Sequence, residues 1–261
     1  MSTRLLRVDL GPGVLAGFTT REGGTSTGHW LGLNLGDHVG DDPLAVAGNR
    51  RALAELVGAP VRFLHQVHGT RVLVLAPAVP EEEDVLPGEG TGPVGRAGTP
   101  EPSGHDAIVL SGTGTAGAVM VADCVPVLLA DPEAGVVAAA HAGRLGLLAG
   151  VLRTTVERMT ALGADPGRVR AAVGPCAGPC CYEVPEELRG HAAGILPDTW
   201  ARTRAGTPAL DLRAGCRQAL RQLGVGRVED VDRCTVEDDL LYSYRRSATT
   251  GRFAGVVRLL P

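Results

Sequence analysis

The stretch Ala118-Val-Met-Val-Ala-Asp-Cys-Val-Pro-Val-Leu-Leu-Ala130 decides how this chain folds. It is an apolar run that is broken once, by the polar pair Asp123 and Cys124. A second apolar run, from Gly135 to Ala140, follows closely and leads into His141-Ala-Gly143. Short apolar runs of this kind are typical of strands that are buried on both faces of a sheet. The sequence therefore predicts neighbouring buried strands, with a thiol and an imidazole where they break or end.

Three interpretations of Cys124 and His141 are open at this point. A lone cysteine in an apolar strand is most often a small core side chain. A thiol beside an imidazole can also be a nucleophile with its base, or a pair of ligands for one metal. An aspartate directly beside Cys124 would be costly to bury without a partner or a task, and this favours a functional site. His68, in the motif His65-Gln-Val-His-Gly69, is a third candidate upstream.

Composition limits the classes of function. The chain has 261 residues, of which 44% are hydrophobic and only 3% aromatic, so we expect a globular core of Val, Leu and Ala. A formal net charge of −4 and the few aromatic side chains disfavour a nucleic-acid-binding protein. All 25 basic residues are Arg, which excludes a Schiff-base lysine and a P-loop lysine. A bound anion must therefore be held by Arg or by backbone amides.

The sequence shows no membrane-spanning or signal-peptide pattern. Each long apolar stretch is interrupted by a charge or a glycine, so we expect a cytoplasmic protein with no membrane partner. Three of the six cysteines are bunched at Cys176, Cys180 and Cys181. In a reducing compartment we expect them to be thiols and not a disulfide framework.

Strands and helices alternate along the chain. Helices are predicted from Asp42 onward, with Pro43 in the first turn, and over residues 145–162 and 211–223. In the second of these helices, Leu145, Leu152 and Met159 belong to an apolar face that is expected to point inward. Further strands are predicted over residues 61–64, 72–75, 169–173 and 228–231, and residues 17–20 end another short strand. Between 76 and 105 Pro, Gly and acidic residues dominate, which predicts a surface loop. Order resumes at residues 106–110 after the loop, and residues 255–260 complete the chain. The pattern favours a single α/β domain over residues 1–261, with helices outside mixed β-sheets.

Six motifs in order resemble the laccase-domain family, also called the purine nucleoside phosphorylase, multicopper polyphenol oxidase or peptidoglycan editing factor family. They are Phe18-Thr-Thr-Arg-Glu-Gly-Gly24, His65-Gln-Val-His-Gly69, Ala122-Asp-Cys-Val-Pro126, Ala139-Ala-His-Ala-Gly143, Gly178-Pro-Cys-Cys-Tyr-Glu183 and Tyr242-Ser-Tyr-Arg-Arg246. The resemblance runs from residue 17 to residue 257. Six ordered motifs are far more specific than any one of them.

The resemblance implies a three-layer α/β/α fold and a metal, usually zinc with copper possible, held by one Cys and two His. Carried over to this sequence, these metal ligands are His68, Cys124 and His141. Three protein ligands leave a fourth position for water or substrate, as a catalytic zinc site requires. One motif departs from the family, whose His-Ala-Gly-Trp-Arg-Gly reads His-Ala-Gly-Arg144-Leu145-Gly here. On a helix this displacement turns the arginine by about 100 degrees.

The activity expected from the resemblance is zinc-dependent phosphorolysis of purine nucleosides (adenosine, inosine and methylthioadenosine), with adenosine deaminase activity. The expected partners are a purine nucleoside and phosphate. Arg21 is expected among the catalytic residues, and Arg245 and Arg246 are expected to bind the substrate. Asp123 is expected to move protons while a metal-activated water attacks the purine.

Four alternatives remain open. They are a peptidoglycan-editing hydrolase acting on a cytoplasmic nucleotide-sugar peptide precursor, a copper-dependent polyphenol oxidase, a metal-free cysteine hydrolase using Cys124 and His141, and a non-catalytic binding protein. The oxidase ranks last, because seven scattered histidines do not supply the imidazoles of a multinuclear copper centre. Metal content separates the zinc mechanism from the pure thiol mechanism.

Overall fold

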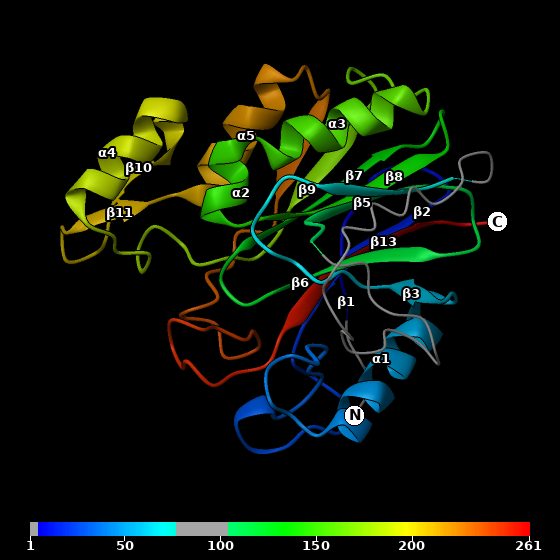
Figure 1. Ribbon diagram of the computed structural model, residues 1–261, viewed down its shortest axis with the longest axis horizontal. Coiled ribbons are helices and arrows are strands. Elements are labelled where there is room, and N and C mark those ends of the chain that lie inside the picture. The colour runs from blue at the N-terminus through cyan, green and yellow to red at the C-terminus, as the bar shows by residue number, and fades with distance from the viewer. Residues whose placement is uncertain (1–4, 77–103) are drawn as a thin grey trace, which may run out of the picture.

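A computed structural model describes residues 5–76 and 104–261 of the chain as a mixed α/β domain with two mixed sheets (Figure 1). Most of the loop predicted over 76–105 lies outside the described residues. The described part holds five α-helices: α1 (Pro43–Val57), α2 (Arg144–Ala149), α3 (Val151–Ala161), α4 (Glu186–Ile195) and α5 (Leu212–Gln222). The expected α/β class is confirmed. In the described part of the chain no helix is both long and apolar enough to cross a membrane.

The first sheet has five strands in the order β1-β2-β13-β6-β3. Their bounds are β1 (Leu5–Arg7), β2 (Val14–Thr19), β13 (Phe253–Leu259), β6 (Ala116–Val121) and β3 (Val61–Arg62). All neighbours are antiparallel except β3 and β6, which are parallel. The last strand of the chain therefore lies in the middle of this sheet.

The second sheet has six strands in the order β12-β9-β7-β8-β5-β4. Their bounds are β12 (Arg227–Asp230), β9 (Arg170–Val173), β7 (Val125–Asp131), β8 (Val136–Ala142), β5 (Ala107–Ser111) and β4 (Val72–Leu75). The outer pairs β12–β9 and β4–β5 are parallel, and the inner pairs are antiparallel. The long apolar stretch of the sequence thus supplies β6 to one sheet and β7 to the other.

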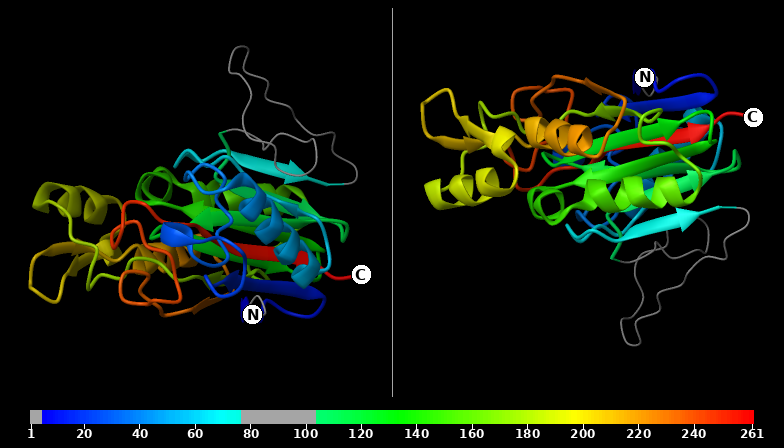
Figure 2. Two further views of the ribbon diagram at one scale, coloured as in Figure 1. Left: turned by 90° about the horizontal axis from the view of Figure 1, so that it is seen from below. Right: turned by 90° about the horizontal axis from the view of Figure 1, so that it is seen from above.

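The two sheets pack face to face, so two stacked β-layers lie between the outer helices (Figures 1 and 2). The core between the sheets includes Phe18 and Val257 from one sheet and Leu128 and Ala139 from the other. Helix α1 covers the outer face of the five-stranded sheet, while α3 and α5 cover the outer face of the six-stranded sheet. Small Ala and Val side chains on the strands allow this close stacking, since they carry little volume between backbones.

The predicted helix starts are confirmed at Asp42 and Asp211. The Asp42 carboxylate accepts the Leu44 N–H at 2.9 Å, and the Asp211 carboxylate accepts the Ala214 N–H at 2.9 Å. Both are N-caps that satisfy a free amide of the first turn. Short polar residues at these positions therefore begin α1 and α5 as expected.

The single helix predicted over 145–162 is wrong, because two helices occupy this range. Gly150 has φ of 98°, a left-handed conformation that ends α2, and α3 begins at the next residue. The break redirects the apolar face, so Leu145 is 55% exposed although it was expected inside. Leu152 and Met159 of α3 are buried as expected.

The sequence analysis missed the part of the chain that projects from one end of the sheets (Figure 1). It consists of α4, the short hairpin of β10 (Trp200–Arg202) and β11 (Pro208–Leu210), and the 3-10 turn Pro197–Thr199. A second 3-10 turn, Gly28–Trp30, precedes α1. Residues 174–183 lead from β9 into the projecting part. These residues also form one wall of the site described below.

Candidate metal centre and active site

The structure brings His68, Cys124 and His141 together at one end of the six-stranded sheet. Their ligand atoms all lie within 4.8 Å of one another. The Cys124 Sγ is 3.7 Å from the His68 Nε2, and the two imidazole rings meet edge to face with centroids 4.7 Å apart. One thiol and two imidazoles at this spacing form a donor set that suits zinc and leaves a fourth position open.

Strand pairing explains why Cys124 and His141 meet. Cys124 lies in the turn between β6 and β7, and His141 is the penultimate residue of β8. The antiparallel register of β7 and β8 places Pro126 opposite His141, so the start of β7 and the end of β8 lie at the same end of the sheet. His68 lies in the connection between β3 and β4, and Cys124 lies in the turn between β6 and β7, at this same end of the sheet.

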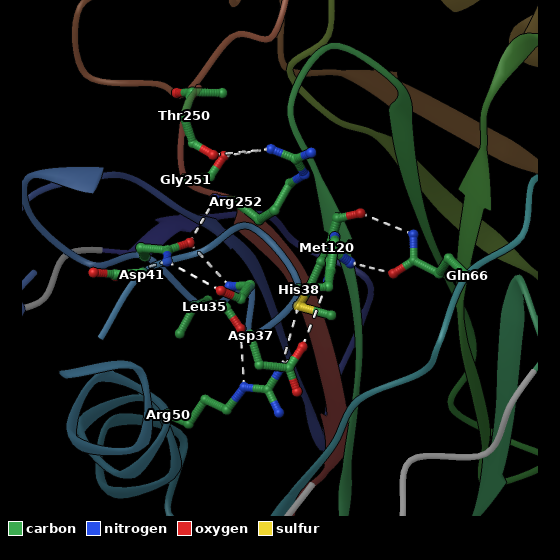
Figure 3. Close-up of polar contacts among 12 residues, drawn as sticks. Leu35, Asp37, His38, Asp41, Arg50, Gln66, Met120, Thr250, Gly251 and Arg252 are labelled. Carbon is green, nitrogen blue, oxygen red and sulfur yellow. Dashed lines mark hydrogen bonds and ion pairs between the residues drawn. The ribbon is translucent and has the colours of Figure 1, made fainter. Parts of the chain in front are cut away.

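His68 is held in place through the neighbouring Gln66. The Gln66 side chain accepts the Met120 N–H at 2.7 Å and donates to the Met120 carbonyl at 2.8 Å, as Figure 3 shows. This pair of hydrogen bonds completes the edge of β6 as a further strand residue would. The loop that carries His68 is thereby fixed to the strand that leads into Cys124.

Asp106 is the functional residue that the sequence analysis missed. Its side chain is fully buried, and its Oδ1 lies 2.8 Å from the His141 Nδ1. The same carboxylate accepts the backbone N–H groups of Val67, His68 and Gly69 at 3.2, 2.8 and 2.6 Å. A carboxylate behind a ligating histidine fixes its orientation and directs the other ring nitrogen toward the metal. Asp106 therefore orients two of the three ligands at once.

The charges in this cluster favour a thiolate. Burial opposes ionisation of Cys124, but the His141 and His68 imidazoles outweigh it and lower the pKa of the thiol to about 6. Burial likewise opposes protonation of His141, yet Cys124 and Asp106 raise its pKa to about 9. The pKa of Asp106 is lowered, because the His141 and backbone hydrogen bonds outweigh its burial. A lowered pKa favours the thiolate, which is the form of cysteine that binds a metal cation.

Gly143 shows that the three donors converge on one small space. A Cβ at this position would lie 2.6 Å from the His68 Cδ2, 3.2 Å from the Cys124 Sγ and 3.4 Å from the His141 Cε1. At Gly146 a Cβ would lie 2.7 Å from the Gly69 carbonyl oxygen. The two glycines let the start of α2 pack directly on the ligands and on the loop of His68. The residues present thus fit a bound metal.

Two residues of the site have left-handed backbone conformations that are rare outside glycine. His68 has φ of 61° and Asp123 has φ of 99°. Such conformations cost free energy and persist where the surroundings enforce them, as they do at many functional sites. Here the strain lies on a metal-ligand candidate and on the residue before another.

Asp123 lies beside the cluster, but both of its carboxylate oxygens are engaged. Its Oδ1 accepts the Thr235 hydroxyl at 2.6 Å, and its Oδ2 accepts the Arg245 N–H at 2.7 Å. Its carbonyl accepts the Ala177 N–H at 2.9 Å. Asp123 thus ties two distant loops to the turn that carries Cys124.

The three predicted arginines have different surroundings. The Arg246 guanidinium donates to the backbone carbonyls of its own loop: Thr235, Val236, Asp238 and Leu241. Arg21 donates to the Leu31 carbonyl at 3.2 Å and stacks on the Tyr242 ring, which packs in the same cluster as Cys124. Arg245 is exposed. Its guanidinium lies 4.4 Å from the centroid of the Tyr182 ring.

Two arginines, Arg144 and Arg245, lie near Tyr182 and form a cationic surface beside the cluster. Burial raises the pKa of the Tyr182 phenol, as does the nearby Cys124, while Arg245 and a hydrogen bond with Arg144 act in the opposite direction. The displaced Arg144 therefore reaches the site through Tyr182. A fourth cation, Arg252, donates to the Thr250 and Gly251 carbonyls (Figure 3). Burial lowers the pKa of Arg252, although Cys124 and Asp123 oppose that shift.

Known proteins resemble the chain over almost its whole length. It is 48% identical to a purine nucleoside phosphorylase of Streptomyces coelicolor over 247 residues, which cover 93% of this chain and 94% of the relative. It is 45% identical to a purine nucleoside phosphorylase of Corynebacterium glutamicum over 245 residues, with 93% of each protein covered.

Solved structures give the same result. The crystal structure of the Neisseria meningitidis protein NMB0706 matches with a TM-score of 0.83 at 35% identity, covering 100% of both chains. YlmD from Geobacillus stearothermophilus matches with a TM-score of 0.83 at 31% identity, covering 99% of this chain and 100% of the other. The family model for multi-copper polyphenol oxidoreductase laccase matches residues 15–260. The chain therefore belongs to the multi-copper polyphenol oxidoreductase laccase family.

Proposed function

We propose that the chain is a zinc-dependent purine nucleoside phosphorylase that also deaminates adenosine. The observation that carries the proposal is the open cluster of His68, Cys124 and His141 beside a wall of arginines. Relatives 44–48% identical over most of the chain are named purine nucleoside phosphorylases, and this supports the same substrates, a purine nucleoside and phosphate.

His68, Cys124 and His141 would hold the metal, and Asp106 fixes the orientation of the two histidines. When bound, zinc supplies a Lewis acid and lowers the pKa of a coordinated water. Asp106 fixes His141 through its Nδ1, so that the Nε2 faces Cys124 and His68. The buried carboxylate also holds the backbone of His68, so neither imidazole needs to reorganise when the substrate binds.

Arg144 and Arg245 are the residues we assign to phosphate. Arg245 stacks on Tyr182 at the edge of the cluster, and Arg144 lies near enough to act against the rise in the pKa of its phenol. A guanidinium binds phosphate oxygens through two parallel hydrogen bonds. In phosphorolysis a phosphate oxygen forms a bond to C1′ of the ribose while the bond from C1′ to the purine nitrogen breaks. The purine leaves with a proton, and ribose 1-phosphate remains. Guanidinium groups near the phosphate hold it for attack and offset its charge.

Asp123 and Arg246 have structural contacts that suggest positioning tasks. Asp123 fixes the loops of Thr235 and Arg245, and Arg246 caps the carbonyls of its own loop. We therefore propose that these two residues act on the substrate through Arg245. The catalytic role of Arg21 and the proton-transfer role of Asp123 stay predictions.

The donor set favours the phosphorylase over a polyphenol oxidase. Among the residues that the structure describes, only two histidines belong to a group of potential metal ligands, and both are in the three-ligand cluster. A multinuclear copper centre needs several imidazoles around each further copper. A phosphorylase needs only arginines to bind phosphate and one metal with an open position, and the described residues can supply both.

The decisive experiment is incubation of the zinc-loaded protein with inosine and with adenosine, with and without phosphate. We expect ribose 1-phosphate from both nucleosides only when phosphate is present, and inosine from adenosine in either case. Absence of nucleoside turnover in protein with a full zinc complement would refute the proposal. Hydrolysis of a nucleotide-sugar peptide by the same preparation would identify the editing hydrolase instead.

The phosphate assignment has its own test in Arg245→Ala. We expect the KM for phosphate to rise by about tenfold or more, because a hydrogen bond to a charged group contributes about 1.5–3 kcal/mol. Arg221→Ala is the matched control, since Arg221 is an exposed arginine of α5 that pairs with Asp198 in the 3-10 turn Pro197–Thr199. An unchanged KM for phosphate in Arg245→Ala would remove this residue from the phosphate site.

A further inference from the structure

A second cluster of potential metal ligands lies outside the site described above. It consists of Cys180, Cys181, Cys234 and Glu237, whose ligand atoms all lie within 4.8 Å of one another. The Cys180 Sγ is 3.1 Å from the Cys181 Sγ, 3.6 Å from the Cys234 Sγ and 3.6 Å from the Glu237 Oε2. Thiolates bound tetrahedrally to zinc at about 2.3 Å lie about 3.8 Å apart, close to these separations.

The cluster joins two loops that are far apart in sequence. Cys180 and Cys181 follow β9, whereas Cys234 follows β12. Backbone contacts hold the loops in register, because the Cys176 N–H donates to the Arg233 carbonyl at 3.3 Å and the Thr235 N–H donates to the Cys176 carbonyl at 2.9 Å. The thiols therefore face one another through the fold of the backbone and not through chance side-chain positions.

The backbone of Gly178 approaches the sulfurs of the cluster closely. The Gly178 N–H donates to the Cys234 Sγ at 3.2 Å, and a Cβ at Gly178 would lie 3.3 Å from both the Cys180 Sγ and the Cys234 Sγ. An N–H group aimed at sulfur stabilises negative charge there. Glycine at this position lets the backbone approach both sulfurs.

Arg204 holds the fourth donor in place. Its guanidinium binds both Glu237 carboxylate oxygens, with the second contact to Oε2 at 3.0 Å, and its backbone N–H donates to the Cys180 carbonyl at 3.4 Å. Three thiolates and a carboxylate around a divalent cation carry a net charge of −2. The guanidinium reduces this to −1, which makes the closed site less costly to form.

We propose that Cys180, Cys181, Cys234 and Glu237 form a second, structural site for a thiophilic divalent metal such as zinc. Four protein ligands close the coordination sphere, as they do in structural zinc sites. The metal fixes the loop of Tyr182 against the loop of Thr235. Asp123 connects the loop of Thr235 to Cys124 and to the Arg245 N–H. The second site thereby stabilises the loops of Tyr182 and Arg245 beside the first cluster.

Metal counting under reducing conditions tests the proposal independently of any enzyme activity. Protein loaded with zinc and freed of excess metal should contain two zinc ions per chain. Cys124→Ala should contain one, and the double variant Cys181→Ser/Cys234→Ser should also contain one. Cys216→Ala is the matched control, because Cys216 is a buried thiol outside both clusters, and it should keep two.

Cobalt and cadmium identify the thiolate donors in the wild-type chain, so this part of the test does not depend on folding of a variant. Replacement by Co²⁺ should give near-ultraviolet sulfur-to-metal absorption dominated by a site with three thiolates, and Glu237→Ala should shift the visible bands while keeping that absorption. Cadmium NMR should show two resonances. One zinc per wild-type chain, a single thiolate-poor cadmium resonance, or a disulfide among the three thiols in reduced protein would each overturn the proposal.

Discussion

The two cysteine clusters of this molecule differ in what surrounds the sulfur. Imidazoles flank Cys124 and, against the effect of burial, lower the pKa of its thiol to about 6. Burial raises the pKa of Cys180, and the thiols of Cys181 and Cys234 raise it further. The first cluster offers three ligands and keeps a position open, whereas the second offers four and is closed. Neighbouring groups, more than cysteine itself, therefore distinguish the proposed catalytic metal site from the proposed structural one.

The supporting residues differ in the same way. Behind the first cluster, the fully buried Asp106 orients the two histidines. Beside the second, the exposed Arg204 pairs with the Glu237 carboxylate and offsets its negative charge. One centre is held by a buried anion that tunes its ligands, and the other by a surface cation that balances charge.

The largest effect should come from Cys124→Ala. Loss of the thiolate empties the first cluster, and we expect nucleoside phosphorolysis to fall by roughly a thousandfold, since a catalytic metal contributes several kcal/mol to the transition state. Zinc at the second cluster should be retained. Steady-state rates together with zinc content check both statements, and an active zinc-depleted variant would contradict the division between the sites.

Asp106→Asn should lower the metal affinity of the first cluster by about 10–100-fold, because the amide cannot accept every hydrogen bond that the carboxylate accepts. Competition with a zinc chelator measures this affinity. The matched control is Asp131→Asn, which changes another fully buried carboxylate that binds backbone amides far from both clusters. The control should lose stability and keep its zinc affinity; equal zinc loss in both variants would count against a specific role for Asp106.

Gly143→Ala should weaken zinc binding at the first cluster by about tenfold, because overpacking costs about 1–3 kcal/mol. The added Cβ would lie 2.6 Å from the His68 Cδ2. Gly190→Ala on α4 is the control, since no heavy atom lies within 4 Å of its Cβ position. That control should leave both sites loaded and stabilise the helix.

The smallest effect concerns the pH dependence of stability and Asp131, a buried carboxylate that belongs to neither cluster. Burial of Asp131 opposes its ionisation, but the Asp165 N–H and Arg168 outweigh it and lower the pKa below 3.8. Its contribution to stability is therefore present above that value and is lost as the pH falls through the folded pKa. Melting temperatures between pH 6 and pH 2 should fall less steeply in Asp131→Asn than in the wild type.

Local sequence signals located much of the first centre. The Ala122-Asp-Cys124 break and His141-Ala-Gly143 showed where strands end, and the structure places both at one end of the six-stranded sheet. Asp106 was missed, although a charged residue directly before the apolar run Ala107–Leu110 is a signal that could have marked it. Its partner His141 is 35 residues away, and only the pairing of β5 with β8 brings them together.

Other features had no readable local signal. The helix break at Gly150 was missed because an isolated glycine is also tolerated inside helices. The displacement of Arg144 by one position left its target open in the sequence, and in the structure it acts on Tyr182, a residue of a different loop. The cysteines were expected to be thiols, and all six are free in the structure. The approach of Cys234 to Cys180, 54 residues earlier, was missed because no spacing rule joins them.

The sequence by itself determined the kinds of donor atoms, the alternation of buried strands and helices, the caps at Asp42 and Asp211, and the absence of any lysine for covalent catalysis. These properties depend on residue type and on neighbours a few positions away. Only the tertiary structure decided which donors meet, which carboxylate stands behind His141 and which arginines face Tyr182. Those contacts depend on strand order and register, which bring together residues that are distant in sequence.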